Sequence, residues 1–373
     1  MRFLLAPDKF KGTLDAPEAA AAMAEGIARA LPAAEVCVRL LADGGEGTLE
    51  CISPSLHSTF ERVAVEDAFG NPTEARVLIT GVGVMLEMSD TARPLARPTP
   101  ESALAASSRG TGLAIAEAGR LRDSRLTVWV GGSASTDGGA GAAQAVGWQL
   151  LDAAGRDIPP GGGSLRRLAR IGPAEGLRAT APELVGACDV ANPLLGVRGA
   201  AGTFGPQKGA GPSEVAVLEE GLAILADRIG ADLGVDVSRV PHGGAGGGMG
   251  AGLIAFFGAR LVSGFEQVAA TVDLDQDVEW ADVVVTGEGR VDLGSLDGKV
   301  VSNVARFCAE RKKICVVVAG EVDLPLDYLP PERALGARLV RSLVATEGRE
   351  PAFNHTREAL ARATSAAVRE AFA

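Results

Sequence analysis

The sequence predicts an α/β protein of two domains, in which both ends of the chain build one flavodoxin-like parallel sheet. Three observations support this fold class. Strand and helix patterns alternate near both termini, which is typical of a parallel sheet. The middle of the chain instead carries consecutive strand patterns and glycine-rich tracts. With 373 residues, the chain also exceeds the size that one hydrophobic core usually serves. The predicted domains are residues 1–61 with 265–373, and an inserted glycine-rich mixed α/β domain over 62–264.

The N-terminal segment begins with a buried strand over residues 2–6, followed by an alanine-rich helix over 15–31. Asp15 and Glu18 have the spacing of a capping box at the start of this helix. A second strand covers residues 34–41 and leads through a glycine loop into the short helical stretch TLECIS. This order of elements predicts the first parallel strand pair of the sheet.

The middle of the chain changes pattern between His57 and Asp90, where successive strands are joined by the turn at Gly70-Asn71-Pro72. Such a turn between two alternating strands predicts an antiparallel hairpin. Later elements of the middle domain are a helix from about Thr111, a strand, glycine loop and helix over 128–147, a strand at 184–189, and helices at 214–228 and 252–261. The C-terminal part returns to the βα pattern, with strands at 281–286, 314–319 and 337–343 and helices at 300–311 and 355–372.

Composition excludes several classes of protein. A net charge of −11 argues against a nucleic-acid partner, which would need a basic surface. Charged residues or glycine interrupt every apolar run before it reaches the length of a membrane span. The five cysteines lack C-x-x-C spacing and are expected to be free thiols. We therefore expect a cytoplasmic protein with no nucleic-acid or membrane partner, and the sequence leaves a homodimer open.

Two glycine tracts indicate an anionic ligand. The stretch 128–147 has the strand, glycine loop and helix order of an anion-binding turn, and residues 243–252 form a second glycine tract. A large, multiply charged ligand such as a nucleoside triphosphate would suit two such tracts. The chain has only six lysines, and Lys11, Lys208 and Lys299 lie in loops beside glycine. We therefore expect these three lysines to contact anions.

Polar residues follow three strands of the predicted parallel sheet, namely Asp8 and Lys11, Asp43 and Glu46, and Glu288, Arg290 and Asp292. Ligands bind beyond the carboxyl ends of such strands. Any single acid could instead cap a helix, but three mixed clusters at one edge indicate a site. The middle domain adds Asp137, Asp189, Asn192 and Lys208 near its glycines. Carboxylates and cations together suit phosphoryl transfer with Mg²⁺, so we expect transfer from ATP to a small hydroxylated acceptor in a cleft between the domains.

Several common motifs are absent. The run Gly294–Val300 is one residue short of a P-loop and lacks its hydroxyl residue. Gly246, Gly248 and Ala251 fit G-x-G-x-x-A, but no strand precedes them directly. The histidines have no metal-ligand spacing, and the segment GGSAS around Ser133 is not a hydrolase elbow.

Seven motifs in order resemble the bacterial glycerate kinase family: LLAPDKFKGTL, ADGGEGT, GGSASTDGGAGAAQAVG, CDVANPLLG, FGPQKGA, GGGMGAGL and TGEGRVDLGSLDGK. The resemblance spans almost the whole chain. It implies ATP- and Mg²⁺-dependent phosphorylation of D-glycerate, with 2-phosphoglycerate as the favoured product. The family usually has serine where Lys9 stands, and the stretch Ser89–Ala92 is more polar here.

The resemblance and the polar clusters together suggest a role for each candidate residue. Lys11 and Arg290 are candidate catalytic cations that bind the glycerate carboxylate or the transferring phosphoryl group. Asp189 is the candidate base or Mg²⁺ ligand, and Glu288 is a second candidate metal ligand. The candidate substrate-binding residues are Asp8, Asp43, Glu46 and Asp292. The candidate nucleotide-binding residues are Lys208, Ser133, Asp137, Lys299, Gly243, Gly244, Gly246, Gly247, Gly248 and Gly250.

Three alternatives remain open from the sequence. The enzyme could phosphorylate another small hydroxy acid or sugar acid. A regulator that binds a nucleotide or metabolite without turnover belongs to a different class, and neither a DNA-binding helix pair nor a basic face supports it. Finally, the glycine loops could serve only close packing in a metabolic α/β protein, which the ordered mixed-charge clusters disfavour.

Overall fold

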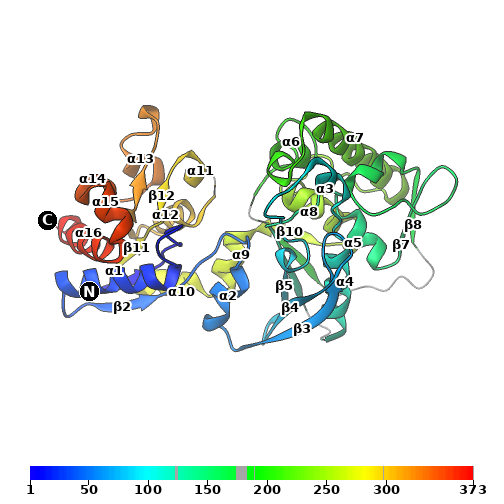
Figure 1. Ribbon diagram of the computed structural model, residues 1–373. Coiled ribbons are helices and arrows are strands. Elements are labelled where there is room, and N and C mark those ends of the chain that lie inside the picture. The colour runs from blue at the N-terminus through cyan, green and yellow to red at the C-terminus, as the bar shows by residue number, and fades with distance from the viewer. Residues whose placement is uncertain (122–124, 174–182, 189, 297, 373) are drawn as a thin grey trace. The chain divides into compact units, whose positions relative to one another are not determined.

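The computed structural model describes residues 1–121, 125–173, 183–188, 190–296 and 298–372. The chain forms two compact units (Figure 1). Unit 1 consists of Met1–Asp43 with Val268–Ala373, and unit 2 consists of Gly44–Gln267. Among the described residues, no helix has the length and apolar character needed to cross a membrane.

Unit 1 is built on the predicted parallel sheet. Its five strands are β1 (Arg2–Leu5), β2 (Glu35–Val38), β11 (Val283–Thr286), β13 (Ile314–Ala319) and β15 (Leu339–Ser342). They lie in the order β15-β13-β11-β1-β2 and all pair in parallel. Counted within the unit this order is 2-1-3-4-5, which is the strand order of flavodoxin-like folds. The prediction of a parallel sheet from both chain ends is confirmed.

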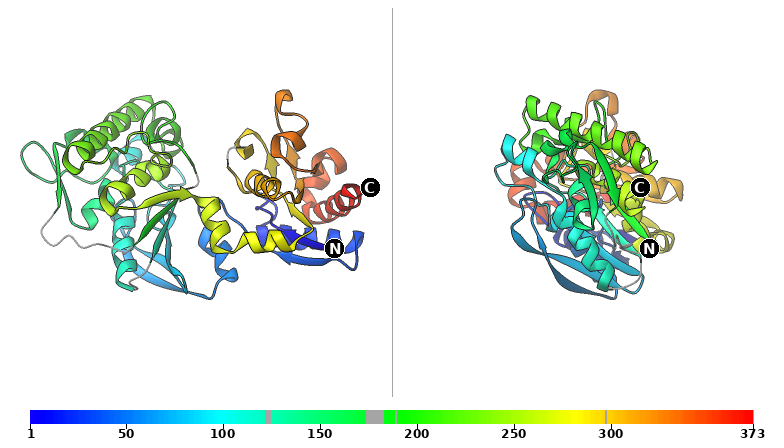
Figure 2. Two further views of the ribbon diagram at one scale, coloured as in Figure 1. Left: turned by 180° about the vertical axis from the view of Figure 1, so that it is seen from behind. Right: turned by 90° about the vertical axis from the view of Figure 1, so that its right-hand side faces the viewer.

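Helices from the two ends of the chain pack together in unit 1. α1 (Ala16–Ala30) begins with the predicted capping box, because Asp15 accepts from the Glu18 backbone while Glu18 accepts from the Asp15 backbone. α16 (Thr356–Ala371) lies beside it in Figure 1 and again from behind in Figure 2. A side chain at Gly26 would begin 2.4 Å from the Ala361 carbonyl oxygen, so glycine allows this close approach.

Further elements complete unit 1. Its other helices are α10 (Leu274–Trp280), α11 (Leu293–Leu296), α12 (Val300–Glu310), α13 (Pro331–Leu335), α14 (Leu343–Glu347) and α15 (Arg349–Asn354). α9 (Gly264–Thr271) includes the boundary between the units. The short strands β12 (Arg290–Val291) and β14 (Glu321–Val322) pair in parallel beyond the main sheet.

Unit 2 contains a mixed sheet of six strands, as the sequence predicts for the middle of the chain. The strands are β3 (Ser58–Glu66), β4 (Pro72–Thr80), β5 (Gly83–Glu87), β6 (Leu126–Val130), β9 (Leu184–Cys188) and β10 (Arg260–Ser263). β3, β4 and β5 form an antiparallel meander, and β5, β6, β9 and β10 are parallel. The predicted hairpin at Gly70-Asn71-Pro72 joins β3 to β4.

The core of unit 2 has two parts, and one helix belongs to both. The helices are α2 (Thr48–Ile52), α3 (Pro100–Ala105), α4 (Arg109–Leu121), α5 (Ala140–Ala145), α6 (Ala200–Phe204), α7 (Pro212–Arg228) and α8 (Ala245–Phe257). In α8, Met249 and Leu253 pack in the cluster around the sheet, whereas Ala251 and Phe256 pack in the cluster around α7. A helix covered on both sides is apolar all round, as this one is.

The structure differs from the sequence predictions at three places in unit 2. The helix predicted over 252–261 ends at Phe257, because Gly258 has a φ of +64° and terminates it, and β10 follows. The antiparallel pair β7 (Trp148–Leu151) and β8 (Arg170–Pro173) was not predicted. The predicted boundary at residue 61 falls inside β3, whose pairing with β4 starts at Ser58.

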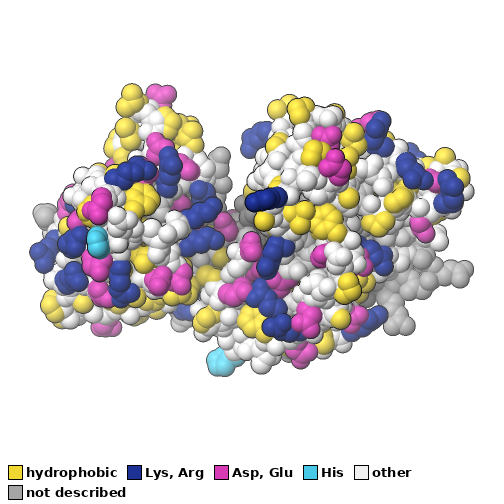
Figure 3. Space-filling model, viewed as in Figure 1, with side chains coloured by type: hydrophobic (Ala, Val, Ile, Leu, Met, Phe, Trp, Pro, Cys, Tyr) yellow, Lys and Arg dark blue, Asp and Glu magenta, His cyan; other side chains and the backbone are white. Residues whose placement is uncertain are grey.

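Acidic and basic side chains are intermixed on the face of each unit that Figure 3 shows. Many of them form exposed ion pairs, such as Arg62 with Glu74 in unit 2 and Arg357 with Glu25 in unit 1. Exposed pairs of this kind contribute little to stability.

Candidate active site

The carboxyl ends of β1 and β11 bring two predicted clusters together in unit 1. The segments that follow the two strands continue side by side. The Ala6 N–H donates to the Val285 carbonyl over 2.9 Å, and the Asp8 N–H donates to the Gly287 carbonyl over 2.8 Å. The side chains of Asp8 and Glu288 therefore start from neighbouring loops at one edge of the sheet.

Glycines allow these loops to approach closely. A side chain at Gly287 would begin 2.0 Å from the Val318 carbonyl oxygen, and one at Gly289 would begin 3.0 Å from the Lys11 backbone nitrogen. The backbone of Lys11 thus lies against the segment that carries Glu288. The sequence GEG keeps this edge compact enough for groups from three strands to meet.

Glu288 is the most perturbed group of the cluster. The residue is 6% exposed, and its Oε1 has no hydrogen-bond partner among the described residues. Its Oε2 lies 4.0 Å from Nζ of Lys299, which lies 3.6 Å from Oδ1 of Asp292. Burial raises the pKa of Glu288 to about 7, against the lowering effects of the Ser295 hydroxyl and the Lys299 ammonium. A buried carboxylate oxygen without a partner is a strong candidate for a ligand contact.

The neighbouring carboxylates respond to the same charges. Burial raises the pKa of Asp8, and the nearby Asp43 carboxylate adds to the rise, while the Lys9 N–H and the Lys299 ammonium oppose it. Burial acts to raise the pKa of Asp292 as well, but Lys299 and Ser295 outweigh it and lower that pKa. The structure therefore brings Asp8, Asp43, Glu288, Asp292 and Lys299 into one interacting cluster, hereafter the edge cluster.

The two predicted catalytic cations lie at the rim of the edge cluster. The Lys11 side chain is exposed. Arg290, at the start of β12, forms an exposed ion pair with Asp323 and also interacts with the charge of Asp292. A guanidinium in an exposed pair can exchange its partner for an anionic ligand at little cost.

The two glycine tracts of unit 2 pack against each other. A side chain at Gly247 would begin 2.0 Å from the Ser135 carbonyl oxygen, and one at Gly252 would begin 2.6 Å from that of Gly138. The Gly138 N–H also donates to the Gly247 carbonyl over 3.1 Å. A side chain would begin within 3.0 Å of another part of the chain at the other predicted nucleotide-binding glycines as well, namely Gly243, Gly244, Gly246, Gly248 and Gly250. Close packing thus accounts for these glycines in the fold.

Asp137 holds the first glycine loop from within. The residue is 1% exposed, and its carboxylate accepts hydrogen bonds from the Ser108 N–H and hydroxyl at 2.8 and 2.9 Å. The N–H groups of Gly139 and Gly141 donate to it as well, each over 3.2 Å. Burial raises its pKa, and these hydrogen bonds oppose the rise. Its carboxylate therefore stabilises the loop, which is an indirect role compared with the predicted nucleotide contact.

Lys208 also points into the first glycine loop. The residue is 6% exposed, and its Nζ donates to Oγ of Ser133 over 3.1 Å and to the Ser135 carbonyl over 2.6 Å. The structure thus places two predicted nucleotide-binding residues, Lys208 and Ser133, in direct contact. Asp189, the predicted base, lies outside the described residues.

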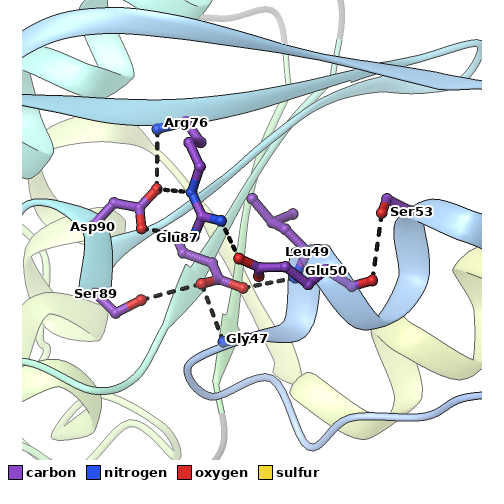
Figure 4. A network of polar contacts seen from close by, with 8 residues as sticks. All are labelled: Gly47, Leu49, Glu50, Ser53, Arg76, Glu87, Ser89 and Asp90. Carbon is purple, nitrogen blue, oxygen red and sulfur yellow. Dashed lines mark hydrogen bonds and ion pairs between the residues drawn. The ribbon is translucent and has the colours of Figure 1, made fainter. Parts of the chain in front are cut away.

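Sequence reasoning did not single out Glu87, the last residue of β5. The residue is 2% exposed, and its carboxylate binds the backbone at the start of α2 (Figure 4). The signal was present, because Glu87 is the one charged residue of the apolar strand GVMLE and stands at its carboxyl end. That is the pattern that pointed to Asp189 after LVGAC.

The edge cluster fits a divalent cation of the magnesium type. Mg²⁺ is usually held by one or two carboxylates together with water and substrate phosphates. Among the described residues, no group of three or more potential metal ligands stands together. The unpartnered Oε1 of Glu288 with Asp8 nearby supplies the small carboxylate set that Mg²⁺ requires.

Comparisons with known proteins agree over most of the chain. A sequence model described as "Glycerate kinase family" matches residues 3–371. A protein named glycerate kinase from Halalkalibacterium halodurans is 38% identical over 86% of this chain and 85% of its own length. One named glycerate 2-kinase from Escherichia coli is 38% identical over 86% of each chain. A crystal structure described as a candidate glycerate kinase 2 from Salmonella typhimurium LT2 matches with a TM-score of 0.80 and 35% identity, covering 99% of this chain and 98% of that one.

Proposed function

The chain belongs to the glycerate kinase family and is a phosphotransferase that uses ATP, and we propose that it phosphorylates D-glycerate with 2-phosphoglycerate as the favoured product. The observation that carries the residue assignment is the edge cluster, in which a buried carboxylate oxygen of Glu288 has no partner among the described residues. Phosphoryl transfer needs such groups, because its catalysis is mainly positioning and the neutralisation of charge.

In this proposal Glu288 holds Mg²⁺, and Asp189 serves as the base rather than as a second metal ligand. The ion, when bound, would neutralise charge on the phosphate oxygens of ATP and help to align them. Lys299 lies 4.0 Å from Glu288 and limits the negative charge that gathers there before the substrates bind. This explains why a lysine stands inside an otherwise acidic group, and it is consistent with its predicted contact with nucleotide phosphates.

The acceptor is held by charge and by hydrogen bonds. Lys11 and Arg290 bind the glycerate carboxylate or the transferring phosphoryl group, for which the planar guanidinium of arginine is suited. The carboxylates of Asp8, Asp43, Glu46 and Asp292 are the candidate acceptors for hydrogen bonds from the two substrate hydroxyls. The acceptor oxygen attacks the γ-phosphorus, the bond from that phosphorus to the ADP oxygen breaks, and Asp189 accepts the hydroxyl proton.

The nucleotide is held by the glycine loops of unit 2. Lys208 fixes the conformation of Ser133 and Ser135, and Asp137 fixes the turn that follows. A glycine loop with a fixed backbone can present N–H groups to phosphate oxygens. The cleft between the domains, the cytoplasmic location and the homodimer stay predictions from the sequence.

The test is ADP release from Mg-ATP with D-glycerate, followed by phosphorus NMR of the product. We expect turnover and a resonance coupled to the proton on C2, which identifies 2-phosphoglycerate. A resonance coupled to the C3 protons would support the kinase activity but contradict 2-phosphoglycerate as the product. Turnover only with another hydroxy acid or sugar acid from a substrate panel would keep the chemistry and overturn the substrate.

A further inference from the structure

Glu87 binds a segment that is distant from it in the sequence. Its Oε1 accepts from the Leu49 N–H over 2.7 Å, and its Oε2 accepts from the Gly47 N–H over 3.2 Å and from the Ser89 hydroxyl over 3.1 Å. Figure 4 shows the carboxylate at the first turn of α2, with these donors around it. One buried side chain therefore joins the end of β5 to the motif ADGGEGT.

The hydrogen bonds of Glu87 replace a local helix cap. α2 has Gly47 at its N-cap, with a φ of +89° and no side chain to accept from the first turn. A serine or aspartate at the cap position is the usual solution, and burying a carboxylate from a remote strand is a costly alternative. The remote arrangement has a consequence that a local cap lacks, because it fixes the loop to the carboxyl edge of the sheet.

The loop that Glu87 fixes carries Glu46. A side chain at Gly132 would begin 3.3 Å from Cβ of Glu46 and 3.3 Å from Cβ of Ser89. Glu46, Ser89 and the first glycine tract therefore meet at one point. Ser89 in turn donates to Glu87. A shift of the Glu87 carboxylate would move the backbone beside Glu46 and the hydroxyl on the other side of Gly132.

A second set of contacts holds the outer side of α2. Arg76 of β4 binds both carboxylate oxygens of Asp90 at 2.9 Å and also pairs with Glu50 on α2 (Figure 4). This arginine is partly exposed, and Glu50 is half exposed. The pair of Arg76 with Glu50 restrains the position of the whole helix α2. The Glu87 carboxylate instead binds N–H groups at the junction of the loop and the helix.

We propose that Glu87 is a positioning residue for the D-glycerate site, which fixes the Gly44–Gly47 loop so that Glu46 is aligned with the substrate hydroxyls. The inference rests on the proposed function, in which Glu46 binds the acceptor. Glu87 itself touches no substrate. Removing its negative charge and one of its acceptor oxygens should therefore impair glycerate recognition and spare the binding of ATP.

The test is Glu87→Gln, with Glu74→Gln on the neighbouring hairpin as the matched control, because Glu74 is exposed and pairs only with Arg62 among the described residues. We expect kcat/KM for D-glycerate to fall about tenfold or more, since a small misplacement of a binding group has large effects. KM for ATP should stay within about twofold, and the control should match the wild type. Equal losses for both substrates would overturn the proposal, because a merely structural role would affect both.

A double-mutant cycle tests the route of the effect. If Glu87 acts through Glu46, the variant with both Glu46→Gln and Glu87→Gln should lose no more kcat/KM for D-glycerate than the more damaged single variant. Losses that multiply would show that the two residues act independently, which contradicts the proposal.

Hydrogen exchange separates this inference from the proposed function. In Glu87→Gln, at least one of the amides of Gly47 and Leu49 should exchange at least about tenfold faster, because each donates to a different carboxylate oxygen and the glutamine side chain keeps only one acceptor oxygen. Unchanged exchange would overturn the positioning role whatever the substrate is, whereas failure of the wild type to use D-glycerate would overturn the proposed function alone. If Glu87→Gln does not fold, Ser89→Ala removes only one donor and should lower kcat/KM for D-glycerate about threefold; unaltered kinetics in that variant would overturn the proposal.

Discussion

The edge cluster of unit 1 and the glycine tracts of unit 2 carry the predicted site residues in opposite ways. In the edge cluster, one oxygen of Glu288 has no hydrogen-bond partner within the described part of the chain, and Lys299 is 40% exposed. At the first glycine tract, Asp137 and Lys208 are both buried. Asp137 accepts a hydrogen bond from the Ser108 N–H, and Lys208 donates one to the Ser135 carbonyl. The edge cluster therefore has charged groups available to contact a ligand. In the glycine tracts, by contrast, the polar groups stabilise the conformation of the loops.

This difference separates two uses of the same residue types. Charged side chains near glycine suggested ligand contacts in both regions, yet in unit 2 close contacts with backbone or side chains account for the predicted nucleotide-binding glycines. Substitutions in the glycine tracts should therefore act first on stability, and substitutions in the edge cluster should act first on turnover. The predictions below test this division, beginning with the largest expected effect on stability.

Gly247→Ala should destabilise unit 2 strongly. The added carbon would begin 2.0 Å from the Ser135 carbonyl oxygen, at a residue with a φ of +71°. We expect a loss of about 4 kcal/mol in the free energy of unfolding, from the clash and the backbone strain together. Gly258→Ala is the matched control, because its φ is +64° but no other part of the described chain lies within 4 Å of the added carbon. It should cost about 1 kcal/mol in denaturant unfolding, and equal losses in both variants would refute the packing explanation.

The stability of the metal-free protein should fall as the pH rises from about 4.5 to about 7. In that window the folded protein keeps a proton on Glu288 that the unfolded chain has already released, because the folded-state pKa is raised to about 7. The stabilisation is complete below pH 4.5 and lost above 7, and it amounts to roughly 3 kcal/mol. Unfolding in EDTA at several pH values measures it. The free energy of unfolding should change less steeply with pH in Glu288→Gln than in the wild type. An identical pH dependence in that variant would contradict the assignment of this effect to Glu288.

Lys208→Met should reduce stability and weaken ATP binding. It leaves the Ser135 carbonyl and the Ser133 hydroxyl without the ammonium donor. The expected loss is about 2 kcal/mol in denaturant unfolding, with a higher KM for ATP. Lys312→Met serves as a surface control and should match the wild type in both measurements. A stable Lys208→Met with normal ATP kinetics would remove this lysine from both roles.

Arg62→Ala should have the smallest effect. Arg62 pairs with Glu74 on the surface of the β3–β4 hairpin, and both side chains are mostly exposed. The free energy of unfolding should change by less than about 1 kcal/mol, with unchanged turnover. A larger loss would mean that exposed charge matters more in this protein than the comparison of the two regions implies.

The sequence was most informative where local patterns decide the structure. The capping box at Asp15, the hairpin at Gly70-Asn71-Pro72 and the parallel sheet strands depend on spacing and periodicity, and each is present. The meeting of Asp8 with Glu288 followed from the rule that the ends of parallel strands share an edge. These features need no knowledge of distant packing.

Other features depend on contacts that no local pattern reveals. The glycines at 247 and 252 are explained only by the return of the second tract onto the first. Glu87 was missed because its partners, the N–H groups of Gly47 and Leu49, come from a segment that is distant in the sequence. The β7–β8 pair joins strands separated by a long connection, which weakens any hairpin signal.

The most direct test of the central claim is the rate of D-glycerate phosphorylation by Glu288→Gln beside Glu25→Gln, a surface control in the same unit that pairs with Arg357. If the unpartnered carboxylate of the edge cluster acts in phosphoryl transfer, kcat should fall on the order of a hundredfold or more. The variant should be at least as stable as the wild type above pH 7, because a buried negative charge is gone, and Glu25→Gln should keep full activity. A Glu288→Gln enzyme that turns over at the wild-type rate would contradict the account.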